Sequence, residues 1–177
     1  MSKPHLLTSS NLIKALRRYA PVSTTHLALH LKVSVPTLHR ALKQVQVEIF
    51  SAGGSKNTRY AARRSLRGSV LPLPIYRIDQ QGVGHYLTSM ELVAPQGAFL
   101  DMRNMAWPVD SEHASGWWGG LPYPIYDMQP QGFIGRNLAR NFEFDLAVSP
   151  SPNDWPDDER WLSLIEQFSL IYKCKVY

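Results

Sequence analysis

The chain has 177 residues, of which 44% are hydrophobic and 19% are charged, and its formal net charge is +5. An apolar fraction of this size excludes a disordered or low-complexity chain, and no run approaches the roughly 20 apolar residues that a membrane-spanning helix needs. The single cysteine, Cys174, cannot form an internal disulfide, and the polar residues 1–11 lack the apolar core of a signal peptide, so we expect a cytoplasmic protein without a membrane partner.

The charge is divided between two parts of the chain. Residues 1–70 hold twelve Lys and Arg against one acid, Glu48, a balance of +11, whereas residues 71–177 hold seven bases against thirteen acids, a balance of −6. All five Trp lie in the second part. We therefore expect two domains, 1–68 and 69–177, and a polyanionic partner for the first, nucleic acid before a membrane. A solvated basic surface without a partner is the alternative.

The first domain carries the pattern of three helices. Apolar side chains recur at helical spacing through Ser10–Ala20, and Pro21 ends this segment. Ser23 can cap a second helix over Thr24–Leu31, and after a short turn Ser34 can cap a third. Two helices, a short turn and a third helix are typical of a helix-turn-helix.

The third helix is predicted to have one apolar face and one basic face. Thr37, Arg40 and Lys43 recur at intervals of three on the face opposite the apolar residues, and His39 lies on the flank. In the major groove, an arginine can pair with guanine, and a threonine can contact a thymine methyl group or a phosphate. We therefore expect Thr37, Arg40 and Lys43 to contact DNA, with His39 either joining them or packing at the flank.

A hairpin is predicted after the third helix. Val47–Phe50 and Thr58–Ala61 have strand patterns, and the turn Gly53–Asn57 between them is rich in glycine. Such a hairpin is the wing of a winged helix-turn-helix, and we expect Lys56 and Arg59 to reach the minor groove or the phosphates of double-stranded DNA. Some winged helices bind protein instead, but the charge favours DNA. Three arginines are expected to extend the positive tract: Arg63, Arg64 and Arg67.

The second domain has the pattern of a small mixed α/β domain. Alternating segments at Ile75–Ile78, Val83–Leu87 and Ala98–Met102 predict a mostly antiparallel sheet, and helices are predicted at Gly132–Arg140 and Arg160–Tyr172. No phosphate-binding loop, nucleophile elbow or zinc motif occurs in the sequence. We therefore expect no catalytic residues, no metal and no cofactor.

A tandem tryptophan, Trp117 and Trp118, lies between Gly116 and Gly119. The glycines leave the backbone free to form a protruding loop, and tryptophan is enriched at the energetic centres of protein interfaces. One interpretation makes the pair a contact for a protein partner. The other makes both side chains part of the core, or of a seam against the winged helix.

Three further stretches carry a family resemblance: Gly119–Pro122, Asp127–Arg136 and Asn153–Asp158. Together with the hairpin they resemble the N-terminal part of HipA-like Ser/Thr kinase toxins, and within these the YjjJ-type proteins, which carry a winged helix ahead of the kinase N-lobe. The resemblance implies an α+β chain, with an N-terminal winged helix-turn-helix followed by a domain similar to the HipA N-terminal subdomain, over about Pro72–Leu164.

The resemblance does not extend to a kinase core. In the family, the ATP-binding loop and the catalytic and metal-binding acids follow this subdomain, whereas only sixteen residues follow Trp161 here. Phosphoryl transfer needs a phosphate cradle and carboxylate-held magnesium. No catalytic residue of the family has a matching position, so we do not expect an enzyme.

The resemblance implies a DNA-binding antitoxin that represses its own operon from an upstream operator, as a homodimer on a repeated site, and neutralises a separately encoded HipA-like kinase toxin. It would be associated with the nucleoid when bound. One alternative is an inert N-terminal fragment of a full-length toxin kinase. Another is a free-standing transcription factor whose second domain senses a ligand.

Overall fold

A computed structural model of the chain describes residues 7–103, 105, 108–126, 132–133, 137, 140–141, 147–156, 158–160 and 162–163. The chain divides into two compact units, Met1–Gly119 and Gly120–Tyr177. The structure is mixed α and β: helices with a small three-stranded sheet come first, and a four-stranded antiparallel sheet follows.

The first unit begins with three helices, α1 (Ser9–Tyr19), α2 (Thr24–Leu31) and α3 (Val35–Gln44). The predicted helices are confirmed, the second with the predicted bounds and the first displaced by one residue at each end. Each helix starts where a hydroxyl accepts a hydrogen bond from a backbone N–H three residues later, which satisfies a donor that the helix cannot. The capping residues are Thr8, Ser23 and Ser34.

Three short strands form an antiparallel sheet beside these helices. They are β1 (Val22–Ser23), β2 (Ile49–Ala52) and β3 (Arg59–Ala62), in the order β1-β3-β2. The predicted hairpin is confirmed, with its first strand two residues later than expected. Its turn needs glycine at position 53, where φ is +101° and a Cβ would lie 2.4 Å from a backbone oxygen.

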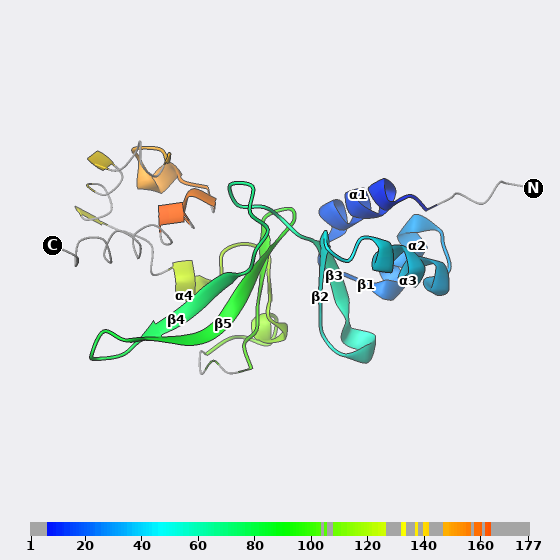
Figure 1. The fold of residues 1–177 in the computed structure, drawn as a ribbon, viewed down its shortest axis with the longest axis horizontal. Coiled ribbons are helices and arrows are strands. Elements are labelled where there is room, and N and C mark those ends of the chain that lie inside the picture. The colour runs from blue at the N-terminus through cyan, green and yellow to red at the C-terminus, as the bar shows by residue number, and fades with distance from the viewer. Residues whose placement is uncertain are drawn as a thin grey trace, which may run out of the picture. The chain divides into compact units, whose positions relative to one another are not determined.

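One hydrophobic core holds the helices and this sheet together. The helix α1 contacts α2, α3 and β3, and Figure 1 shows the three helices grouped at one end of the β2–β3 hairpin. The buried side chains come from all three helices and include Leu12, Leu16, Leu27, Leu38 and Leu42. Burying one such leucine stabilises the fold by about 1.5–3 kcal/mol, so this core fixes which helix faces remain at the surface.

The same unit continues into a four-stranded antiparallel sheet. Its strands, in spatial order, are β4 (Leu73–Ile78), β5 (Gly84–Val93), β6 (Gly97–Leu100) and β7 (Trp117–Trp118). The first and third predicted strands are confirmed with shifts of one or two residues. The second was predicted to end at Leu87, whereas β5 runs on to Val93.

The extension of β5 has a simple cause. Thr88, Met90 and Leu92 are buried in alternation with half-buried neighbours, which is the period-2 pattern of a strand. The sequence prediction ended the strand early because polar residues interrupt the apolar run there. β6 pairs with this second half, so the extension supplies the middle of the sheet.

The second unit is described only in part. It contains α4 (Tyr123–Tyr126) and a short 3-10 helix at Pro152–Asp154. Trp155 is buried, and its indole N–H donates to the Ser149 carbonyl at 2.6 Å. The predicted helices at 132–140 and 160–172 fall mostly on residues outside the described ranges. Within the described ranges, no helix has the length and apolarity to cross a membrane.

Candidate nucleic-acid interface

The outer face of α3 carries the residues that were predicted to contact DNA. Arg40, Lys43 and His39 are exposed, and Thr37 is half-buried. The inner face is fixed because the leucines at positions 38 and 42 are buried in the core. Residues three apart lie on the same side of a helix, so the threonine, arginine and lysine form one continuous surface strip.

Thr37 has a structural task in addition to its place on this strip. Its backbone N–H donates to the Ser34 hydroxyl at 3.4 Å, and the two hydroxyl oxygens lie 2.9 Å apart. The threonine is therefore part of the N-terminal cap of α3. The contact between the two hydroxyls restrains the Thr37 side chain beside the capping residue Ser34.

The β2–β3 hairpin presents two exposed cations, Lys56 and Arg59. Lys56 lies in a 3-10 turn, Ser55–Asn57, that separates the two strands. The Thr58 hydroxyl donates to the Ser55 carbonyl at 3.0 Å, which holds this turn closed. Arg59 pairs with Ser23 in the sheet register, so the position of its backbone is fixed by two neighbouring strands.

Charge on this part of the chain is almost entirely of one sign. Across residues 7–62 the sequence holds a single acid, Glu48, and eight Lys and Arg, all of them exposed. Exposed cations without acidic neighbours produce a positive field that attracts polyanions. The basic residues other than those on α3 and the hairpin are Lys14, Arg17, Arg18 and Lys32.

Arg63 does not extend the exposed positive tract, and this prediction is corrected. Its side chain is 23% exposed and its guanidinium forms an ion pair with Glu91 of β5. The same guanidinium donates to the Ile49 carbonyl at 3.1 Å and lies over the Phe50 ring. Arg64 is also half-buried, whereas Arg67 is exposed. The sequence pattern could not distinguish Arg63 and Arg64, which are half-buried, from Arg67, which is exposed.

This ion pair belongs to a seam between the three-stranded and four-stranded sheets. Arg64 N–H donates to the Leu92 carbonyl and Ala94 N–H donates to the Ala62 carbonyl, both at 2.9 Å. These bonds continue β3 along the end of β5. The expected domain boundary at residue 68 therefore lies inside one compact unit, and a division there stays a prediction.

An aromatic cluster fills the same seam. Trp117 is 7% exposed and packs with the Phe50 and Phe99 rings, whose centroids lie 5.7 and 5.1 Å from its own. Ala61 and Val93 complete the cluster. For Trp117, the structure matches the second interpretation, in which the side chain lies in a seam against the N-terminal part of the chain.

Trp118 is also buried, at 5% exposure. Its ring stacks on the His113 ring, and the two centroids are 4.2 Å apart. The two tryptophans form strand β7 and do not form the protruding loop of the first interpretation. Gly116 is needed for a close approach, since a Cβ there would lie 2.5 Å from the Leu100 carbonyl. Burial removes the reason for assigning the pair to a partner contact, and no observation tests that role directly.

The pH dependence of stability at Glu91 tests how the ion pair with Arg63 joins the two sheets. Burial raises the pKa of the Glu91 carboxyl above its ordinary value of 4.5, although Arg63 acts in the opposite direction. A raised pKa in the folded state contributes stability below the unfolded-state pKa, and this contribution is lost as the pH rises through the folded-state pKa. We therefore expect the advantage of the unmodified chain over Glu91→Gln to shrink as the pH rises above 4.5.

Urea unfolding of both proteins across this pH range measures the effect. A Ser65→Ala variant, which changes an exposed residue two positions after Arg63, serves as a control and should track the unmodified chain. An advantage that grows with pH would mean that the ion pair outweighs the cost of burying the carboxylate.

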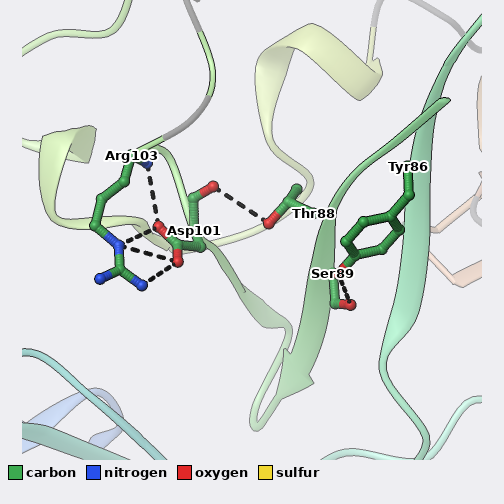
Figure 2. Close-up of polar contacts among 5 residues, drawn as sticks. All are labelled: Tyr86, Thr88, Ser89, Asp101 and Arg103. Atoms are coloured by element: carbon green, nitrogen blue, oxygen red, sulfur yellow. Dashed lines mark hydrogen bonds and ion pairs between the residues drawn. The ribbon is translucent and has the colours of Figure 1, made fainter.

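Polar groups on the four-stranded sheet are paired with one another. Figure 2 shows the Arg103 guanidinium against the Asp101 carboxylate, with contacts of 2.5–3.1 Å, and the Tyr86 hydroxyl 2.7 Å from that of Ser89. The hydrogen bonds from Arg103 hold the pKa of the Asp101 carboxyl below its ordinary value. An acid stabilised in its charged form is a poor proton donor near neutral pH.

Two histidines are likewise paired with carboxylates. His85 lies 2.6 Å from Asp79, and His113 lies 2.8 Å from Asp110. Their hydrogen bonds lower the pKa of each carboxyl. Among the described residues, no group of three His, Cys, Asp or Glu is arranged to hold a metal ion.

Residues 70–169 match the YjjJ-like toxin, middle domain family. The chain belongs to this family. It is also 28% identical over 139 residues to Toxin YjjJ of Escherichia coli (strain K12), which covers 78% of this chain and 29% of that protein. The resemblance to YjjJ-type proteins that the sequence predicted is thus supported at the level of the family. No solved structure matches the chain.

The family match covers only part of the chain. The middle-domain family covers β4 to β7 and most of the second unit, and leaves α1 to α3 and the β2–β3 hairpin outside it. The chain spans less than a third of the length of Toxin YjjJ. The family model therefore does not cover the basic surface described above.

Proposed function

We propose that this chain is a DNA-binding regulator in the YjjJ-like toxin family, and that its N-terminal part is a winged helix-turn-helix. The observation that carries the proposal is the strip Thr37, Arg40 and Lys43 on the outer face of α3, followed by a hairpin with two exposed cations. A helix of this kind enters the major groove of B-DNA, and a hairpin beside it reaches the neighbouring phosphates.

Each group has a distinct task in this proposal. Arg40 donates two hydrogen bonds to a guanine, and Thr37, held by the cap of α3, contacts a thymine methyl group or a phosphate. Lys43 together with Lys56 and Arg59 of the hairpin neutralises phosphates, which contributes affinity without sequence preference. A homodimer on a repeated site would double both kinds of contact.

For the middle domain, we propose that it neutralises a separately encoded HipA-like kinase toxin. Membership of the YjjJ-like toxin family supports a toxin–antitoxin context. The sequence holds no phosphate-binding loop, so we propose no kinase activity for this chain. In the competing proposal, the chain is part of a longer toxin. The downstream reading frame distinguishes the two proposals, because an adjacent kinase gene favours the antitoxin and an in-frame continuation favours the toxin.

Fluorescence anisotropy with labelled duplex DNA from upstream of the gene tests the DNA-binding proposal. We expect the affinity to fall roughly tenfold or more between about 50 mM and about 200 mM salt, because bound phosphates release counterions. Arg40→Ala should cost about 1–3 kcal/mol on the preferred sequence. Arg17→Ala, which removes the same charge from the exposed side of α1, is the matched control and should cost less. An affinity indifferent to salt would reject the proposal.

A further inference from the structure

Beside α2 lies a hollow of about 590 Å³. The end of α1, strand β1, helix α2 and Arg59 of β3 form its walls, and α3 takes no part. A volume of this size lies within the range of pockets that hold small organic molecules. The hollow is thus separate from the strip on α3. It includes Arg59, which is one of the two exposed cations of the hairpin.

The polar groups of this hollow favour a negative charge. Ser23, His26, His30 and Arg59 supply hydrogen-bond donors, and none of the described residues that line it is acidic. Within the described part of the chain, Arg59 has no carboxylate partner. The Tyr19 and His30 rings meet edge-on, with their centroids 3.8 Å apart, so one wall of the hollow is aromatic. A guanidinium without a competing acid binds carboxylates and phosphates, and the neighbouring serine and histidine donors can add hydrogen bonds.

The remaining surface of the hollow is apolar. Its accessible apolar side chains are Tyr19 and Leu29, which are 38% and 76% exposed, whereas Val22 and Leu27 are buried in the core. An inorganic ion would leave these two exposed side chains in water, whereas a ligand with an apolar body would cover them. A site that combines a few directed polar groups with accessible apolar side chains is typical of small-molecule pockets.

We propose that the hollow binds a small organic anion, in which a carboxylate or phosphate is attached to an aromatic or aliphatic body. Arg59 and the two histidines hold the charged group, and Tyr19 and Leu29 contact the body.

A regulatory consequence rests on the proposed function. The Arg59 side chain that binds the anion is also one of the two hairpin cations proposed to bind phosphates. An occupied hollow therefore weakens DNA binding, and DNA weakens anion binding by the same factor.

The binding step is measured on the full chain without DNA, by NMR of the histidine imidazole groups. The probes are benzoate and phenyl phosphate, which distinguish the two kinds of anion, and benzyl alcohol as their neutral counterpart. We expect saturable shifts at His26 and His30 with at least one anion below about 10 mM, and an affinity at least about tenfold lower for the alcohol. Imidazole signals of His39, on α3, should not move.

Two pairs of variants make the result specific. Leu29→Glu places a negative charge at the rim and should abolish anion binding, whereas Val47→Glu, at a residue 77% exposed outside the hollow, should not. Because both replaced side chains are exposed, neither variant is expected to unfold the chain. Arg59→Gln should weaken anion binding at least about fivefold, whereas Lys56→Gln should weaken only DNA binding.

The outcomes separate the two proposals. Absence of saturable shifts, or equal shifts with Leu29→Glu and with the unmodified chain, overturns the anion site while leaving DNA binding as measured. If the chain binds an anion but no DNA, the result supports the anion site and rejects the proposed function. If both ligands bind, benzoate or phenyl phosphate must raise the apparent Kd for DNA, and an unchanged Kd overturns the competition at Arg59.

Discussion

Replacing Trp117 by alanine is expected to cost about 3–5 kcal/mol of the free energy of unfolding. The indole lies at the centre of the seam, in contact with Phe50 of β2 and Phe99 of β6, and its removal leaves a cavity that the surrounding backbone cannot close. For a chain of this length, such a loss lowers Tm by roughly 10 °C. Thermal unfolding followed by circular dichroism measures it.

The control for this variant is another aromatic residue that is exposed. Phe133 is 76% exposed, and Phe133→Ala should change the free energy of unfolding by less than about 0.5 kcal/mol. A Trp117→Ala protein as stable as the unmodified chain would contradict the seam. It would also restore the interpretation of the tandem tryptophan as a surface for a partner.

Reversing the two charges on α3, in Arg40→Glu/Lys43→Glu, is expected to reduce the affinity for upstream DNA by about a hundredfold or more. Two attractive contacts become repulsive, and a base contact is lost. The double variant Lys14→Glu/Arg17→Glu makes the same change in net charge on the exposed side of α1 and should reduce the affinity much less.

Anisotropy titrations at one salt concentration compare the two double variants, with circular dichroism to confirm that both are folded. Equal losses would show that only total charge matters, and would remove α3 from the interface. A loss confined to the α3 variant supports recognition by this helix.

Local signals made most of the N-terminal part predictable. Ser23 and Ser34 cap helices where the sequence indicated, and Gly53 occupies a turn that only glycine fits. These features depend on neighbours within a few positions, so a sequence pattern contains them. The exposed placement of Arg40 followed directly, because burying its opposite helix face fixes which side points to water.

Long-range packing was beyond the sequence. Trp117 is buried against β2 and Arg63 is half-buried against β5, and each strand lies far from its partner residue along the chain. The sequence left Trp117 between a partner contact and a core or seam position, and it assigned Arg63 to a basic surface. The hollow beside α2 also went unforeseen, since Arg59 and His30 are brought together only by the pairing of β1 with β3. That both residues can donate hydrogen bonds was visible in the sequence, but their convergence was not.

The central claim is that this chain binds DNA in the cell through the outer face of α3. Chromatin immunoprecipitation followed by sequencing, with the tagged full chain and with Arg40→Glu/Lys43→Glu expressed at equal levels, tests it most directly. We predict enrichment at a small number of sites, including the region upstream of its own gene, and loss of that enrichment in the double variant. Absence of enriched sites for the unmodified chain, or equal enrichment by both proteins, would contradict the claim.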